Sequence, residues 1–342
     1  PVLEARGVAT MAAVSRADCE ALVESLDVKI AGGDLDAKTA RNIWSMWRTI
    51  CKGARSAKVR ALRVRDDNPT TDVEPPDKGE AKEKQWLYPE EFDRLMRCEE
   101  VPVRWRRLYA LASYLCLRAG ELAALEARDI DLRHGRVRIE RAVDRHTKLV
   151  GTTKTGDVRT LDPPPTLRPL LESLVREAGS GRLVAFPPFE SLAETLRVHC
   201  KRAGIDRPEL YEKTKTSLAL RWHDLRASGI SWLAMDPERS QFDVRDYAGH
   251  SEVSTTDLYV RRGRAAARIG GLPFGALPER VIAGAIDHGS DRAIDSEPEA
   301  VGTIQEKKRP QRDSKPLTLR RLRRIKLDPM RSPPPDRIGL TP

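Results

Sequence analysis

The segment YAGHSEVSTTDLYV, residues 247–260, carries two side chains that could take part in chemistry. His250 follows a glycine, and Tyr259 comes nine residues later, after a run of small hydroxyl residues. A tyrosine beside leucine and valine on a short amphipathic helix is usually a packing residue. A phenol can also act as a nucleophile, but its pKa of about 10 means that its surroundings must activate it. The interpretation of Tyr259 therefore depends on which other groups the chain supplies.

Three upstream motifs supply cationic and imidazole side chains. They are LRAGEL with Arg118, TKTGDVR with Lys154, and WHDLRAS with His223 and Arg226. Each motif is weak when taken singly, because an Arg-x-x-Glu-Leu on a helix is usually a solvated ion pair and a lysine in a turn is usually exposed. The His-x-x-Arg motif is also common in proteins, so by itself it does not indicate a function. The occurrence of all these motifs in this order along one chain is much harder to obtain by chance.

This combination of residue types suits the attack of a side chain on a DNA phosphodiester. The transition state concentrates negative charge on two non-bridging oxygens, and planar guanidinium groups can donate paired hydrogen bonds to them. Arg118 and Arg226 are the candidates. Donors fixed in advance contribute on the order of 3–4 kcal/mol each, by analogy with oxyanion holes. The six histidines lack ligand spacing and no His-Glu-x-x-His occurs, so the sequence predicts neither a metal nor a cofactor.

Together these motifs resemble those of the tyrosine recombinase (phage integrase) family. The resemblance covers residues 86–265 and rests on Arg-x-x-Glu-Leu, a hairpin lysine, His-x-x-Arg, Gly-His and Thr-x-x-Tyr, in this order. It implies that Tyr259 is the nucleophile. It also implies that His223 and His250 assist proton movement and bond a phosphate oxygen.

The resemblance extends to further contacts with DNA. Lys154, at the tip of a β-hairpin, would protonate the leaving 5′ oxygen, and Lys148 is the alternative. Arg104, Arg106 and Arg107 are expected to contact phosphates, with a solvated helix face as the competing interpretation.

The function implied by the resemblance is that of a site-specific DNA recombinase, or integrase. Such an enzyme cleaves and rejoins strands through a 3′-phosphotyrosyl intermediate and a Holliday junction, here for integration or excision of a mobile element. The expected partners are double-stranded DNA recombination sites, further copies of the chain in a homotetramer on paired sites, and DNA-bending accessory proteins.

Three other functions compete with this interpretation. They are a related DNA-binding protein that no longer cleaves, a type IB topoisomerase-like enzyme, and a helical regulator with a basic tail. The intact set of arginines, lysine, histidines and tyrosine argues against binding alone. The N-terminal helical region and the Gly-His motif favour recombination over topoisomerase activity.

Length and composition set the broader frame. A chain of 342 residues is long enough for two domains, and it contains no unbroken apolar run that could span a membrane. The N-terminal residues include acidic side chains and lack an apolar core, so the sequence predicts no secretory signal. Five scattered cysteines favour a reducing cytoplasm. The expected location is the cytoplasm of a bacterium, in association with the nucleoid. The net charge of +10 lies mostly in residues 301–342, which hold 12 Lys and Arg against 4 Asp and Glu.

The elements that must position the motifs follow from periodicity and capping. The prediction is a mainly α fold with one small antiparallel sheet (α+β), in which the catalytic domain follows a small helical core-binding domain. Residues 1–63 would form that helical domain, shortened at its N-terminus, and 64–85 a linker. Residues 86–275 would form the catalytic domain, and 276–342 a basic, Pro-rich tail with the composition of disorder.

Local predictions are more detailed. Helices are expected to begin after Ser15 and Asp36 and at Pro89, and a three-stranded sheet is expected within residues 128–163. The second helix would place Ile43, Trp47 and Ile50 on one face, with Trp44 and Cys51 beside it, and both tryptophans are interpreted as core residues. A stripe of Leu108, Leu111, Ala112 and Leu115 would face the core of the catalytic domain.

The chain also departs from the family pattern. Leu115, Cys116 and Leu117 stand where the family often has Thr-Gly-Leu, so the turn before Arg118 is expected to be altered. Pro237 ends the His-x-x-Arg helix in place of the more common glycine.

Overall fold

The computed structural model describes most of the chain outside the C-terminal region. The described residues are 2–153, 156–252, 255–257, 259–260, 263 and 273–284. Within them, no helix combines the length and the apolar character needed to cross a membrane.

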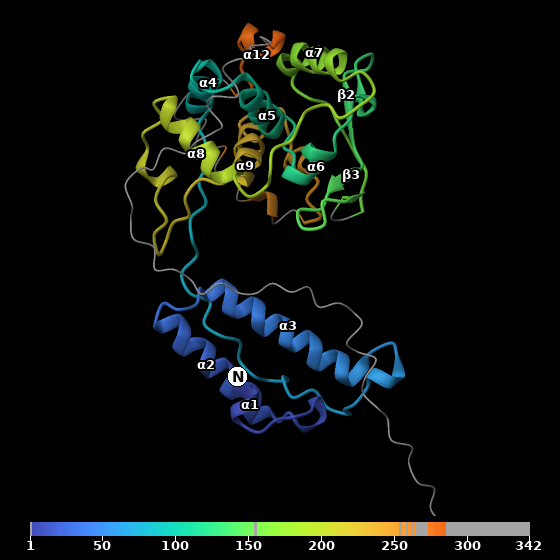
Figure 1. The fold of residues 1–342 in the computed structure, drawn as a ribbon, viewed down its shortest axis with the longest axis vertical. Coiled ribbons are helices and arrows are strands. Elements are labelled where there is room, and N and C mark those ends of the chain that lie inside the picture. Colours follow the sequence, from blue (N-terminus) through green and yellow to red (C-terminus); the bar gives the residue numbers. More distant parts are fainter. Residues whose placement is uncertain are drawn as a thin grey trace, which may run out of the picture. The chain divides into compact units, whose positions relative to one another are not determined.

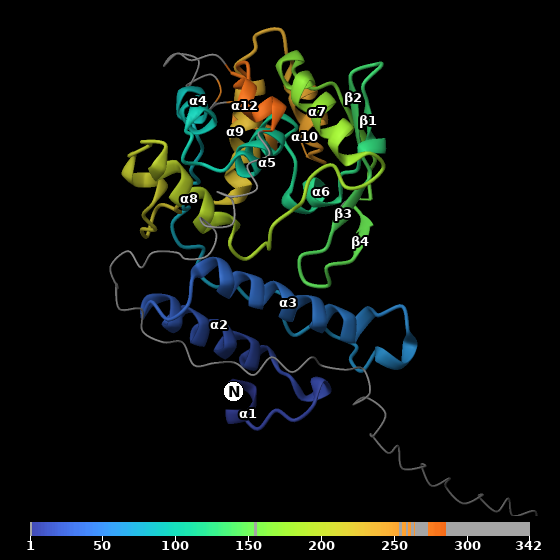
Figure 2. The same ribbon diagram turned by 45° about the horizontal axis from the view of Figure 1, so that its top comes forward.

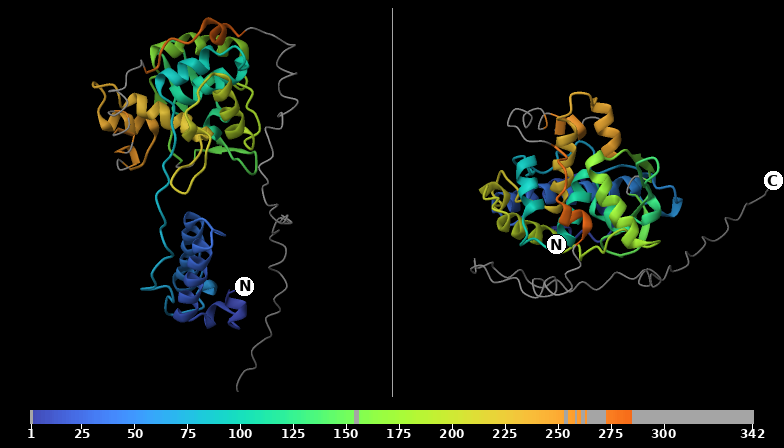
Figure 3. Two further views of the ribbon diagram at one scale, coloured as in Figure 1. Left: turned by 90° about the vertical axis from the view of Figure 1, so that its left-hand side faces the viewer. Right: turned by 90° about the horizontal axis from the view of Figure 1, so that it is seen from above.

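Three helices form the N-terminal region: α1 (Val2–Ala5), α2 (Arg16–Ala31) and α3 (Ala37–Ser56). Ser15 caps α2 in a capping box with Asp18, and the Asp36 side chain accepts a hydrogen bond from the Lys38 amide, so both predicted helix starts are confirmed. The two longer helices lie side by side (Figure 3), and Val14, Cys19 and Trp44 form a small core.

The buried face of α3 lies on the side of Trp44. The buried residues of this helix are Ala40, Trp44, Cys51 and Ala54. Ile43 and Ile50 keep 40% and 48% of their surface exposed, and Trp47 is half-buried with its Nε1 donating to Cys19 Sγ at 3.4 Å. Two apolar stripes therefore run along this helix: the one with Ile43, Trp47 and Ile50 stays partly exposed, and the one beside it, with Trp44 and Cys51, is buried. The small Ala40 and Ala54 side chains allow close approach on the Trp44 side.

Part of the expected linker packs on these helices. Arg65 Nη1 donates to three carbonyl oxygens of residues 11–14, and Val73 packs against the Val14 cluster. Arg41 donates to the Pro76 carbonyl at 2.8 Å. The division of the chain into domains remains a prediction, but residues 65–76 are tied to the N-terminal helices.

The larger core lies in residues 86–282. Its helices are α4 (Pro89–Arg97), α5 (Val103–Tyr114), α6 (Ala119–Ala124), α7 (Arg168–Ala178), α8 (Leu192–Arg202), α9 (Trp222–Leu233), α10 (Gln241–Ala248) and α12 (Glu279–Ala283). Helix α9 runs through the middle of this group and packs on α5 (Figure 2). The helix start at Pro89 and the buried stripe on α5 are confirmed. Short 3₁₀ turns occupy 11–13, 60–62, 127–129, 165–167 and 208–210.

Two small antiparallel sheets flank the helices (Figure 1). The first has the order β1 (Ile130–Asp131), β2 (Arg136–Ile139) and β5 (Arg159–Leu161), with Val137 opposite Leu161. The second is a hairpin of β3 (Arg141–Val143) and β4 (Val150–Thr152).

The three-stranded sheet was predicted and the separate hairpin was not. Strand β3 continues directly from β2 in sequence but lies against α6, where Gly120 has no side chain. A Cβ atom on Gly120 would lie 2.5 Å from the Val143 carbonyl oxygen. This close approach draws β3 out of the first sheet and towards the helix that begins after Arg118.

The folded part of the chain extends beyond the predicted boundary at residue 275. Leu277 and Val281 are buried in the larger core, and α12 packs on α5 and α7 (Figure 1). Arg107 donates to the Val281 and Ile282 carbonyl oxygens, both at 2.8 Å, and so caps this helix. The predicted disorder of the remaining tail falls on residues 285–342, which lie outside the described part.

Candidate active site

The turn between α5 and α6 delivers Arg118. Cys116 has φ +48°, which is the left-handed conformation that the family's glycine would adopt easily. Its thiol is buried and donates to the Ser113 carbonyl at 3.4 Å. Arg118 then sits at the N-cap of α6. The departure from Thr-Gly-Leu therefore leaves a left-handed residue before the arginine, and a small side chain tolerates it.

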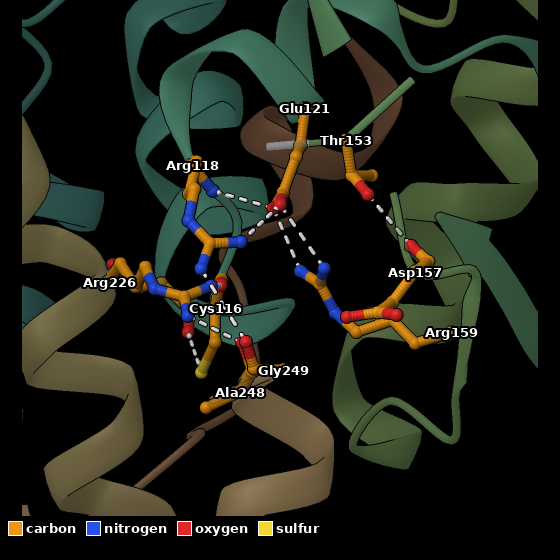
Figure 4. Close-up of polar contacts among 10 residues, drawn as sticks. Cys116, Arg118, Glu121, Thr153, Asp157, Arg159, Arg226, Ala248 and Gly249 are labelled. Carbon is orange, nitrogen blue, oxygen red and sulfur yellow. Dashed lines mark hydrogen bonds and ion pairs between the residues drawn. The ribbon is translucent and has the colours of Figure 1, made fainter. Parts of the chain in front are cut away.

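Glu121 holds Arg118 in place together with a second arginine (Figure 4). Its carboxylate accepts hydrogen bonds from Arg118 Nη1 at 2.6 Å and the Arg118 amide at 3.0 Å, and from Arg159 at 2.8 and 3.1 Å. Glu121 is only 1% exposed. Burial alone would raise the pKa of this carboxyl group, but the hydrogen bonds and charges of Arg159 and Arg118 outweigh it and lower the pKa to about 2.

Arg226 lies beside Arg118 and connects α9 to the Cys116 turn and to the end of α10. It lies on α9, is 1% exposed, and donates to the carbonyl oxygens of Cys116 and Ala248 (Figure 4). Burial, followed by the positive charge of Arg118, lowers its pKa to about 10, so the guanidinium group stays charged at neutral pH. The backbone of the Cys116 turn and the end of α10 thus fix this guanidinium group, and among the described residues no carboxylate forms an ion pair with it.

Two histidines stand beside the arginine pair. His250 follows Gly249, the left-handed C-cap of α10, whose carbonyl oxygen lies 3.5 Å from Arg118 Nη2. Burial and then the charges of Arg226 and Arg118 lower the pKa of His250 to about 4, so this imidazole is neutral at pH 7. The same causes act on His223, on the first turn of α9, and lower its pKa as well. Part of the His223 side chain is open to water, which screens the charges of the arginines, but its pKa is still lowered, so this ring is also neutral at pH 7.

Tyr259 lies against His250. The two rings stack with centroids 5.7 Å apart at an interplanar angle of 30°, and Tyr259 is only 7% exposed. The same segment packs on α9 of its own chain, because a Cβ on Gly263 would lie 2.4 Å from the Ser231 carbonyl oxygen. Tyr259 is therefore a packed aromatic residue whose ring also borders the candidate site.

Arg221 adds a further positive charge near the phenol. It donates to the fully buried Asp224 at 2.8 and 3.1 Å. These hydrogen bonds raise the pKa of Arg221, and the charge of an ionised Tyr259 contributes in the same direction. The described part of the site thus holds four arginines against the carboxylates of Glu121 and Asp224, an excess of positive charge that suits an anionic phosphate and a phenolate.

Some of these residues escaped the sequence interpretation. Glu121 and Arg159 stand inside quoted motifs, and Arg221 and Asp224 flank His223. Two of these contacts could have been predicted: Arg118 with Glu121, and Arg221 with Asp224, are charged residues three positions apart at a helix start, which is the spacing of a capping pair. The joining of Glu121 to Arg159 had no such signal, because it connects α6 to β5 across 38 residues.

Lys154 lies outside the described residues. In the connection from β4 to β5, the Gly156 amide donates to the Thr153 carbonyl at 2.9 Å. The alternative, Lys148, lies in the connection between β3 and β4, which form a hairpin. Lys148 pairs with Glu190 at 3.3 Å and lies over the Phe189 ring. These contacts already engage the alternative lysine.

The predicted phosphate contacts on α5 divide into two kinds. Arg106 and Arg107 are buried: Arg106 donates to the Met96 carbonyl, and Arg107 pairs with Glu177 while capping α12. These contacts tie both side chains to α4, α7 and α12 and not to the residues around Arg118, which argues against a role for either in binding phosphate at this site. Arg104 is exposed and stays a candidate. In the part of the chain that the structure describes, no group of three potential ligands could hold a metal ion.

A mainly helical fold with small antiparallel sheets around this site is that of a tyrosine recombinase catalytic domain. A family model described as "Phage integrase family" matches residues 85–265, more than half of the sequence, and the chain belongs to that family. No curated protein matches the chain.

Solved structures share the fold at low sequence identity. A fragment of the Tn1549 transposon integrase in complex with transposon right end DNA is 15% identical, with a TM-score of 0.54 over 79% of this chain and 90% of that one. A lambda integrase dimer bound to a COC′ core site is 16% identical, with a TM-score of 0.52 over 72% and 80%.

Proposed function

We propose that this protein is a site-specific DNA recombinase that cleaves and rejoins strands through Tyr259. The observation that carries the proposal is the stacking of Tyr259 on His250, beside the two fixed guanidinium groups of Arg118 and Arg226. A phosphodiester bound by these arginines would place its phosphorus within reach of a phenol held by the same chain.

The proposed reaction exchanges one phosphate ester for another. The Tyr259 oxygen forms a bond to phosphorus as the bond from phosphorus to the 5′ oxygen breaks, which leaves a 3′-phosphotyrosyl link. Arg118 and Arg226 donate to the non-bridging oxygens, where charge accumulates. A neutral imidazole can take up the phenol proton, and Lys154 would give a proton to the departing oxygen. Attack by another strand reverses these steps and leads through a Holliday junction.

The partners follow from the family and the fold. We infer that the substrate is double-stranded DNA carrying paired recombination sites, with four copies of the chain on them and with accessory DNA-bending proteins. The Tn1549 and lambda integrases, which share the fold, were solved on transposon and core-site DNA. Their likeness supports integration or excision of a mobile element in a bacterial cytoplasm. In this proposal, the N-terminal helices together with residues 65–76 form the core-binding domain, and the larger core, which extends through α12, forms the catalytic domain. Arg104 contacts a phosphate.

The test uses nicked suicide duplexes made from the DNA that flanks the gene. We expect the wild-type chain to form a covalent adduct that resists denaturant, and Tyr259→Phe to form none. The matched control is Tyr88→Phe, because it removes a phenol at the start of α4 on another part of the core. The control should form the adduct at the wild-type rate.

Other outcomes would identify the competing functions. Site-dependent binding without any adduct in the wild type would overturn the proposal in favour of a binding protein. Relaxation of a supercoiled plasmid that lacks the site would instead indicate topoisomerase activity.

A further inference from the structure

Thr256 connects the nucleophile segment to His250. Its Oγ1 lies 3.1 Å from His250 Nδ1, and the side chain is completely buried. Thr256 precedes Tyr259 by three residues, about one helical turn, and the His250 ring stacks on the Tyr259 ring. One short segment therefore carries the phenol and also contacts Nδ1 of the imidazole that stacks on it.

Burial favours one direction for this hydrogen bond. A buried hydroxyl group must donate its hydrogen, because an unsatisfied donor costs free energy. Threonine in a helix can donate to the carbonyl four residues earlier, but the described residues show no such bond from Thr256 to Glu252. Within the described part of the chain, His250 Nδ1 is the acceptor in reach.

We propose that Thr256 is a positioning residue that donates to His250 Nδ1 and thereby holds the imidazole proton on Nε2. His250 then offers an N–H donor to a phosphate oxygen and has no lone pair available for the Tyr259 proton. Uptake of that proton falls to His223, the other imidazole of the site. The low pKa of His250 agrees with this, since the neutral ring has a single proton to place at pH 7.

The tautomer can be measured without any reaction. In the full-length chain labelled with ¹⁵N-histidine, long-range proton–nitrogen spectra distinguish the two tautomers of each ring, and His250→Gln assigns the signal. We expect the Nε2–H form in the wild type and in Thr256→Ser, and a mixture of tautomers in the nearly isosteric Thr256→Val. An Nδ1–H form in the wild type would overturn the inference, whether or not the variants fold. So would an unchanged tautomer in a folded Thr256→Val.

The catalytic consequence rests on the proposed function and is tested by adduct formation. We expect Thr256→Val to form the adduct about 10-fold more slowly, as the loss of one orienting hydrogen bond predicts, and Thr256→Ser to restore the rate. If the wild type forms no adduct, the proposed function fails while the spectra still decide the tautomer. If Thr256→Val reacts at the wild-type rate, the proposed function survives and the role of Thr256 is refuted.

Discussion

Gly229 lies at a close approach of α9 to α5, one turn beyond Arg226. A Cβ atom on Gly229 would lie 1.9 Å from the Ser113 carbonyl oxygen and 3.0 Å from Cys116 Sγ. Ser113 and Cys116 are fully buried, and the nearest atom belongs to the backbone, so no flexible side chain can move aside. We therefore predict that Gly229→Ala destabilises the protein and displaces the site.

The magnitude follows from the geometry. Separating these atoms from 1.9 Å to an acceptable 3.0 Å moves two packed helices apart by about 1 Å. Overpacking a core costs about 1–3 kcal/mol and occasionally more, and a clash with backbone belongs at the upper end. Alanine regains about 0.5–1 kcal/mol through its higher helix propensity. The net expectation is a loss of about 2 kcal/mol or more in the free energy of unfolding.

Gly53→Ala is the matched control. Gly53 lies inside α3, and a Cβ atom built there meets nothing within 4 Å. The same chemical change should therefore stabilise the protein by about 0.5–1 kcal/mol. Urea denaturation followed by circular dichroism would measure both variants. A Gly229→Ala protein as stable as the wild type would refute the close-packing argument.

The same variant should also affect the proposed chemistry. The carbonyl oxygen of Cys116 accepts a hydrogen bond from Arg226, so a shift of α5 against α9 separates that donor from its acceptor. We expect Gly229→Ala to form less adduct on a suicide duplex at a temperature where it remains folded, and Gly53→Ala to behave as the wild type.

Three further predictions concern charge and backbone conformation. The pKa of Glu121 is lowered from 4.5 to about 2, so the stability that it contributes is complete above about pH 4.5 and is lost as the pH falls towards 2. Glu121→Gln should therefore cost about 3 kcal/mol at pH 7 and flatten the acid limb of a stability–pH curve; an unaltered curve would contradict this. Cys116→Val should cost about 2 kcal/mol or more by thermal denaturation, since a β-branched residue is strained at φ +48°, whereas Cys116→Gly should unfold within a few degrees of the wild type. Arg104→Ala should weaken DNA binding and lower its salt dependence by about one counterion. Arg107→Ala should destabilise the fold by about 1–3 kcal/mol, more than Arg104→Ala does; the reverse pattern would show that the two assignments are exchanged.

The sequence was sufficient for features that depend on neighbouring residues. Ser15, Asp36 and Pro89 mark helix starts because caps act within one turn, and all three begin helices in the structure. The motif order from Arg118 to Tyr259 was enough to indicate the family, which the family match confirms. The small antiparallel sheet was also predictable, because alternation and a glycine turn are local signals.

Tertiary structure decided which of several equivalent faces was buried. Periodicity alone cannot choose between the Trp44 and Ile43 faces of α3, and only contact with α2 does so. Arg104, Arg106 and Arg107 look alike in sequence, yet the last two are buried by α4 and α12. The contacts of Glu121 with Arg159 and of Thr256 with His250 likewise depend on how separate segments meet. Local sequence determines where an element begins, but the burial of a charge depends on residues far along the chain.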